Sequence, residues 1–291
     1  MRLKADLLLL LTAIIWGSGF ISQRVAAQYV SPFFFNGSRF LLAALLLLPI
    51  SHLYRKLDRE MLRWSLLGGA LLFLAATPQQ AGLRWTTAAN AGFITSLYVV
   101  LVPLILLVFW RQKLSWITWV SAIIAVIGVK MLSSPGAMRL SPGDGLILAS
   151  AVLWAVHVIV VGKAALRLDL LAFSNGQFIV CALFNLLASL FFDLPTAAAL
   201  DAAWLAILYA GVFPVAVGFT LQVVGQKHAP AADAALILSL ESVSAAVFGF
   251  FLLGEGLAMA QVIGCGLILL AIVLVQLKGS GTTLQAAESP G

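Results

Sequence analysis

The chain has very few charged side chains. Asp, Glu, Lys and Arg make up 10% of its 291 residues, and 62% of the residues are hydrophobic. An ordinary soluble domain carries about 25% charged residues. A chain of this composition cannot cover a water-facing surface, which excludes a soluble enzyme, a secreted disulfide-rich protein and a disordered chain. The composition therefore predicts an all-α integral membrane protein.

Cysteine and histidine are also scarce. Cys181 and Cys265 lie in separate apolar runs, and His52, His157 and His228 are far apart, so neither a disulfide framework nor a metal site is expected. The sequence contains no G-x-x-x-x-G-K-[ST], H-E-x-x-H or G-x-S-x-G motif. We therefore expect no cofactor, no metal, no catalytic residue and no ATP hydrolysis by this chain.

Apolar segments fill most of the sequence, and the breaks between them hold nearly all of the polar residues. A helix of about 20 apolar residues spans a bilayer, so ten such helices would use about 200 residues. The sequence predicts ten transmembrane helices, at 5–24, 32–50, 62–83, 88–109, 115–132, 143–163, 171–191, 202–224, 232–252 and 257–277.

The Lys and Arg residues fall mostly on one side of the predicted membrane. With the N-terminus inside, the inner segments hold twelve of the 17, the outer segments hold four, and Arg39 lies within a span. The twelve are Arg2, Lys4, Arg55, Lys56, Arg59, Arg63, Arg111, Lys113, Lys163, Arg167, Lys227 and Lys278, and the four are Arg24, Arg84, Lys130 and Arg139. This asymmetry predicts a multi-pass protein of the inner (plasma) membrane with both termini in the cytoplasm. The net charge of +6 is then explained by the orientation of the protein in the membrane. We therefore expect no nucleic-acid partner.

The two halves of the chain resemble each other. Matches recur at an offset of 138 residues and then at an offset of 143; they include Asp6/Asp144, Trp16/Trp154, Phe35/Phe173, Phe40/Phe178, Thr77/Thr220, Gln79/Gln222 and Gly82/Gly225. Each half has five predicted helices, an odd number, so the second copy is inserted upside down. Inverted repeats of this kind are typical of secondary transporters. We predict a first repeat at 1–134, a second at 135–278, and a disordered cytoplasmic tail at 279–291.

Charged side chains inside predicted spans are costly and need a partner or a water-filled cavity. Glu241 lies near the centre of the ninth span, and its repeat counterpart is Tyr98. Glu241 either takes up a proton or binds a substrate amine, or it links helices, for example against Arg39. Arg39 either contacts an anionic substrate group or bonds backbone carbonyls, and its uncharged counterpart, Gln177, argues against a symmetric binding role. The sequence leaves these alternatives open.

Aromatic and amide side chains recur near the middle of the predicted spans. Trp16 and Trp154 lie about halfway along theirs, although membrane tryptophans prefer the interface. They either line a substrate cavity or pack helices together. Gln79 and Gln222 either donate hydrogen bonds to substrate or join helices. His157, one turn from Trp154, either relays protons or packs in the core.

Several segments resemble the EamA type of the drug/metabolite transporter superfamily. These are Trp16–Phe20 (WGSGF), Ser38–Phe40 (SRF), Ala88–Pro103 (AANAGFITSLYVVLVP) and Leu238–Glu255 (LSLESVSAAVFGFFLLGE), and the resemblance covers about residues 5–277. The first half departs from the pattern, since Arg111-Gln112-Lys113 stands where the second half has Gly254-Glu255-Gly256. The Leu-Gly-Glu turn is therefore interpreted as structural, at a helix end.

The resemblance implies a ten-helix carrier of two inverted EamA repeats that exports small metabolites by alternating access. Members of the family export amino acids, including aromatic ones, or toxic cations. The midplane set of Trp16, Tyr98, Trp154 and Phe178 favours an apolar or aromatic amino acid, and toxic or drug-like organic cations are the alternative. A channel would need a continuous polar path and a membrane enzyme a reactive cluster, and the sequence shows neither.

The expected partners are a small-molecule substrate and the lipid bilayer, with proton coupling left open, in a monomer or homodimer. The predicted substrate-binding residues are Trp16, Arg39, Gln79, Tyr98, Trp154, His157, Phe178, Gln222 and Glu241.

Overall fold

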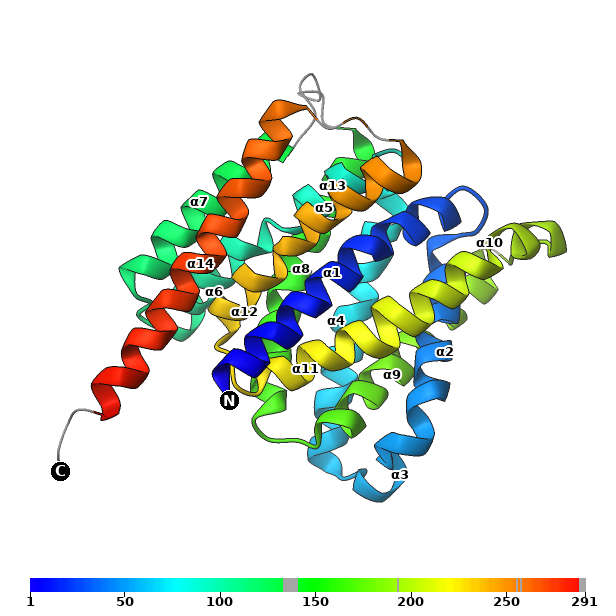
Figure 1. The fold of residues 1–291 in the computed structure, drawn as a ribbon. Coiled ribbons are helices and arrows are strands. Elements are labelled where there is room, and N and C mark those ends of the chain that lie inside the picture. The colour runs from blue at the N-terminus through cyan, green and yellow to red at the C-terminus, as the bar shows by residue number, and fades with distance from the viewer. Residues whose placement is uncertain (133–140, 193, 255, 257, 288–291) are drawn as a thin grey trace.

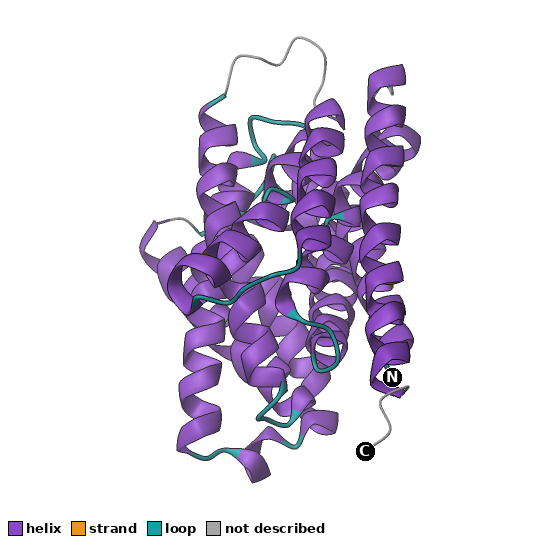
Figure 2. Cartoon of the chain, turned by 90° about the vertical axis from the view of Figure 1, so that its left-hand side faces the viewer, coloured by secondary structure: helices purple, strands orange, loops and turns teal. Residues whose placement is uncertain are grey.

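The computed structural model of the chain describes residues 1–132, 141–192, 194–254, 256 and 258–287. Across these residues all regular structure is helical, and most of the connections are short (Figures 1 and 2). Within them, eight helical segments are long and apolar enough to cross a membrane, and two further apolar helices are shorter. These ten segments correspond to the ten predicted spans.

The first five spans contain seven helices. They are α1 (Arg2–Ala26), α2 (Pro32–Ser51), the short α3 (Leu53–Lys56), α4 (Arg59–Gly82), α5 (Ala88–Thr95), α6 (Tyr98–Trp110) and α7 (Trp116–Leu132). The next five spans are built from α8 (Pro142–Ala165), α9 (Leu170–Phe192), α10 (Ala197–Ala210), η1 (Gly211–Phe219), α11 (Thr220–Gln226), α12 (Ala231–Leu238), α13 (Leu240–Leu253) and α14 (Met259–Ala287).

Polar residues in the breaks fix where many of these helices begin. The side chain of an N-cap residue accepts a hydrogen bond from a free backbone N–H of the first turn, which stabilises the helix start. Seven of the described helices begin in this way, with N-cap residues Ser31, Asp58, Thr87, Ser115, Ser141, Asp169 and Thr196. Pro32 and Pro142 follow their caps at the first helical position, where no N–H is needed.

The fourth and ninth spans are broken at equivalent places. The fourth span divides into α5 and α6 at Ser96 and Leu97, and the ninth divides into α12 and α13 at Ser239. Ser96 and Ser239 occupy the same repeat position, 143 residues apart, and the Ser96 hydroxyl donates to the Ser239 carbonyl oxygen at 3.4 Å. The two broken spans therefore meet at their breaks, deep inside the bundle.

The eighth span is irregular in another way. Its middle part, η1, is a nine-residue π-helix that contains Pro214. Proline has no N–H and cannot donate a helical hydrogen bond. The π-helix is rare in proteins overall, and those that occur are frequently at functional sites. The repeat counterpart, around Leu71 in α4, is regular α-helix, so this feature breaks the likeness between the halves.

Helix packing follows the predicted repeat. α2 packs on α9, and α7 packs on α14 along one edge of the bundle (Figure 1). The remaining large contacts come in equivalent pairs: α4 on α9 matches η1 on α2, α1 on α13 matches α8 on α6, and α4 on α8 matches α1 on α10, η1 and α11. Close approach depends on small residues, as where Gly128 of α7 lies against the Gly264 backbone of α14.

Two details of the helix ends bear on the predictions. α13 ends at Gly254, whose φ of 66° is the left-handed conformation that glycine adopts most easily, as expected for a structural turn. Arg111 ends α6 in the same way with a φ of 51°. The structure differs from the predicted tail, because α14 continues to Ala287. Residues 288–291, and Glu255 of the Leu-Gly-Glu turn, lie outside the described residues.

Candidate functional site

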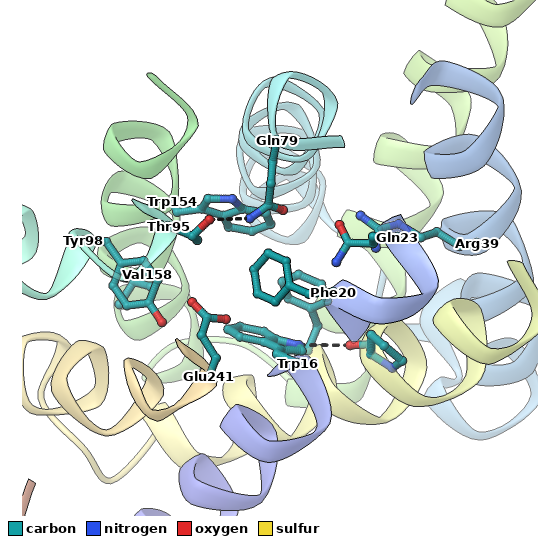
Figure 3. Close-up of a pocket in the computed structure, with 12 residues that line it drawn as sticks. Trp16, Phe20, Gln23, Arg39, Gln79, Thr95, Tyr98, Trp154, Val158 and Glu241 are labelled. Atoms are coloured by element: carbon teal, nitrogen blue, oxygen red, sulfur yellow. Dashed lines mark hydrogen bonds between the residues drawn. The ribbon is translucent and has the colours of Figure 1, made fainter. Parts of the chain in front are cut away.

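A central cavity lies where the two broken spans meet α1, α4 and α8 (Figure 3). It leaves about 40 Å³ for the centres of water molecules. One water needs about 10–15 Å³ by this measure, so the cavity holds only a few waters in this conformation. The lining residues are Trp16, Phe20, Gln23, Arg39, Gln79, Thr95, Tyr98, Trp154, Val158, Pro214, Phe219 and Glu241.

The breaks in the fourth and ninth spans place two polar side chains at the cavity. Tyr98 begins α6 directly after one break, and Glu241 lies in the first turn of α13 after the other. In Figure 3 the Tyr98 hydroxyl and the Glu241 carboxylate lie close together. The Tyr98 hydroxyl is a hydrogen-bond partner of the Glu241 carboxylate, so the two broken spans also interact through these side chains. Transporters commonly form their substrate sites from such discontinuous helices.

The π-helix η1 provides one wall of the cavity and fixes Trp16. The Trp16 indole Nε1–H donates to the Pro214 carbonyl oxygen at 3.1 Å. The Trp16 ring also contacts Phe219, the last residue of η1, with 4.6 Å between ring centroids, and Trp154 stacks on Phe219 at 5.7 Å. Phe219 therefore joins the two repeat-related tryptophans into one aromatic wall.

Arg39 supplies a positive charge to the same cavity. It is 3% exposed, and its guanidinium carbon lies 5.0 Å from the Phe35 ring centroid and 5.2 Å from that of Phe40. No hydrogen bond or salt bridge joins Arg39 to another described residue, and Figure 3 shows it beside Gln23, across the cavity from Glu241. The alternatives in which Arg39 pairs with Glu241 or bonds backbone carbonyls are therefore absent from this conformation.

Glutamine completes the polar lining. Gln79 of α4 donates from Nε2 to the Thr95 hydroxyl at 2.9 Å. Gln23 of α1 accepts a hydrogen bond from Gln80 at its backbone carbonyl, while its side-chain Oε1 has no partner among the described residues. Figure 3 shows the Gln23 amide beside Arg39 and the Gln79 amide beside Thr95, so donors and acceptors lie at two places on the cavity wall.

The structure brings together six of the nine predicted binding residues. Trp16, Arg39, Gln79, Tyr98, Trp154 and Glu241 line the cavity. His157, Phe178 and Gln222 do not. The rings of His157 and Phe178 both contact Phe219, which does line the cavity, at 6.0 and 6.2 Å between ring centroids. His157 bonds to Gln177 at 3.1 Å, and Gln222 is fully buried.

Three of the six lining residues outside the predicted set share a helix face with a predicted one. Phe20 and Gln23 follow Trp16 by four and seven positions, and Val158 follows Trp154 by four, which is the spacing of one helix face. Helical periodicity could have found these three. Phe219 has no such signal, because its repeat counterpart is Ala76.

A metal-dependent site has no support in the described residues, where no group of three or more His, Cys, Asp or Glu side chains is placed to hold a metal ion. The cavity instead combines aromatic faces, one carboxylate, one guanidinium and several amides. This set suits reversible binding of a small organic molecule that carries charge.

Comparison with known proteins identifies the class. The sequence profile of the EamA-like transporter family matches residues 3–134 and 141–277, which is most of the chain. The chain therefore belongs to the EamA-like transporter family and is a multi-pass membrane protein.

Its relatives are transporters by name. An "Uncharacterized transporter" of Archaeoglobus fulgidus is 36% identical over 282 residues, covering 95% of this chain and 87% of the relative. The "Uncharacterized inner membrane transporter YedA" of Escherichia coli K12 is 28% identical over 271 residues, covering 91% and 88%. One crystal structure at 21% identity superposes with a TM-score of 0.77 over 99% of this chain and all of the other, which shows a shared fold.

Proposed function

We propose that the chain is a secondary transporter that exports aromatic or apolar amino acids through the central cavity by alternating access. One observation carries the proposal: a carboxylate and a guanidinium line one cavity between aromatic walls, and no salt bridge joins them. A zwitterionic amino acid complements both charges. Glu241 would receive its ammonium group, Arg39 its carboxylate, and the Trp16–Phe219–Trp154 wall its side chain.

The size of the cavity requires movement during binding. About 40 Å³ holds a few waters and is too small for an amino acid, since sites for small organic ligands span about 300–1,000 Å³. The breaks at Ser96 and Ser239 and the π-helix η1 lack regular α-helical hydrogen bonding, so they are where the spans can bend. In alternating access, such bending would open the cavity to one side of the membrane at a time.

A second candidate substrate is an organic cation. A carboxylate set among Trp and Tyr rings also suits a cation without a carboxylate, because ring faces attract positive charge. This alternative leaves Arg39 without a role in binding, which is why we rank it second.

Counterflow of labelled phenylalanine into proteoliposomes tests the proposal, with three unlabelled competitors. We expect phenylalanine to compete best, because phenethylamine lacks the carboxylate and 3-phenylpropionate lacks the ammonium group. Stronger competition by phenethylamine would make the protein a cation transporter. Absence of counterflow for every aromatic and apolar amino acid would refute the proposal. Export itself is measured in cells as a fall in accumulated amino acid when the protein is expressed.

Two variants test the aromatic wall. Trp16→Ala and Trp154→Ala remove the ring faces, so each should abolish counterflow while the protein remains folded. Trp116→Ala is the matched control, because Trp116 is 72% exposed and does not line the cavity. Normal transport by both cavity variants would mean that the tryptophans only pack helices.

Transport by Glu241→Gln across a pH series tests what the carboxylate does. Gln keeps the shape and hydrogen bonding of Glu but cannot titrate or hold a charge. If Glu241 couples transport to a proton, the variant loses the pH dependence and still binds substrate. If Glu241 pairs with the ammonium group, the variant loses affinity at every pH. Glu60→Gln, at an exposed position, is the control. Wild-type behaviour at every pH would leave Glu241 a structural residue.

A further inference from the structure

A second, larger cavity lies at the side of the bundle where α1 begins. Its volume is about 580 Å³, within the range of small-molecule sites. It is formed by the ends of α6, α8 and α11 and the beginnings of α7 and α12, and it shares no lining residue with the central cavity. The function proposed for the central cavity does not use this second cavity.

This cavity, which we call the basic cavity, carries a net positive charge. Lys113, Lys163 and Lys227 line it, and no salt bridge joins any of them to a described carboxylate. Among the described residues, Asp233 is the one acidic residue that lines it, and it accepts a hydrogen bond from Arg2 at 3.0 Å, so three lysines outweigh one aspartate. Three lysines therefore face one cavity, and an anion is its natural occupant.

The same cavity is apolar on another side. Leu106, Ile159 and Leu166 line it together with the lysines, and Leu166 is 71% exposed. A soluble anion gains nothing from such a surface. A molecule with a charged head and a hydrocarbon chain satisfies both parts, because burial of apolar surface is favourable.

Aromatic residues place the basic cavity at the depth of lipid head groups. Trp110 ends α6 and Trp116 begins α7, on either side of the loop that contributes Lys113, and they are 48% and 72% exposed. Membrane tryptophans concentrate at the interface between hydrocarbon and water. The Lys163 ammonium lies over the Trp110 ring at 3.6 Å from its centroid, which holds the charge at this level.

We propose that the basic cavity binds the phosphate group of an anionic phospholipid, with Lys113, Lys163 and Lys227 as its ligands. Basic pockets between transmembrane helices are known to bind lipid head groups in this way. The proposal does not depend on which solute the central cavity carries.

Native mass spectrometry of the purified full-length chain tests the proposal, with phosphatidylglycerol and phosphatidylcholine of the same acyl chains as probes. The wild type should retain phosphatidylglycerol in preference to phosphatidylcholine. Each lysine near a membrane surface changes anionic-lipid binding about fivefold, so the triple variant K113Q/K163Q/K227Q should lose the preference. The triple variant with arginine at these positions should keep it.

The matched control is K4Q/R63Q/K130Q, which removes three exposed charges outside the basic cavity. Equal retention of phosphatidylglycerol by the wild type and the K113Q/K163Q/K227Q variant would overturn the proposal, and so would equal retention of the two lipids by the wild type. A third arm adds inorganic phosphate. If millimolar phosphate displaces phosphatidylglycerol and raises the melting temperature as much as the lipid does, the ligand is a soluble anion and the lipid assignment is wrong.

Discussion

Gly17→Ala measures how closely α1 must approach α13. A Cβ atom at residue 17 would lie 2.2 Å from Cβ of Ser244, 2.7 Å from the backbone nitrogen of Ala245 and 2.7 Å from the carbonyl oxygen of Glu241. Carbon atoms in contact are normally about 3.5–4.0 Å apart, so the helices must separate by about 1 Å. Two of the three atoms are backbone atoms, which cannot rotate away.

The expected loss of stability follows from this clash. Overpacking of a close-packed interior costs about 1–3 kcal/mol. At Gly266 in α14 an added Cβ meets nothing within 4 Å, so Gly266→Ala gains up to about 1 kcal/mol of helix propensity. The same chemical change should therefore destabilise at position 17 and stabilise, or leave unchanged, at position 266.

Thermal unfolding of both variants in one detergent gives the comparison. One kcal/mol shifts the melting temperature by about 2–4 °C in a protein of about this size, so Gly17→Ala should melt several degrees below the wild type. Counterflow should fall as well, because the contact lies between Trp16 and Glu241. If Gly17→Ala melts at the wild-type temperature and transports normally, the close contact between α1 and α13 is not needed and the reasoning fails.

Three smaller predictions follow from other parts of the chain. Reporter fusions at Gly291 and within residues 133–144 should lie on opposite sides of the membrane; signals from the same side would contradict the predicted topology. Burial raises the pKa of Asp169, but the 2.6 Å hydrogen bond from Lys56 helps to hold that pKa below its ordinary value. The pair therefore stabilises the fold above the pKa of the unfolded carboxyl, and this contribution is lost as the pH falls through the folded-state pKa. Both side chains are 39% exposed, so Lys56→Gln should cost less than about 1 kcal/mol in neutral-pH unfolding experiments. Cys181 is fully buried and should resist a membrane-permeant maleimide until the protein is denatured; rapid labelling of the native protein would contradict its placement.

The sequence was sufficient for the ten spans, because long apolar segments between polar breaks leave little choice of structure in a membrane. It also singled out six of the twelve residues that line the central cavity. Trp16, Trp154 and Glu241 stood out because large aromatic or charged side chains at mid-span are unusual, and the structure places all three on one cavity. The residues that share their helix faces could have been added from periodicity alone.

The features of the cavity that the sequence did not predict depend on backbone conformation and on tertiary packing. The π-helix at 211–219 places Phe219 between the two tryptophans, and a change of helical register leaves no mark in composition. His157 and Phe178 matched the expected chemistry equally well, but Phe219, which contacts both, lines the cavity and they do not. Packing decides which side chains of a crowded apolar core line a cavity. A repeat offset in the sequence does not contain this information.

The placement of charge separates the centre of the protein from its ends. At the side where α1 begins, Arg2 binds both Asp6 and Asp233, and Asp169 binds Lys56, so these carboxylates have cationic partners. In the central cavity Arg39 and Glu241 are each 3% exposed, and no salt bridge joins either of them to a described residue. A buried charge with no opposite charge beside it costs several kcal/mol, so packing alone would favour apolar side chains at both positions. Retention of both charges on one cavity supports the proposal that their partners arrive with the substrate. A zwitterion brings one partner for each.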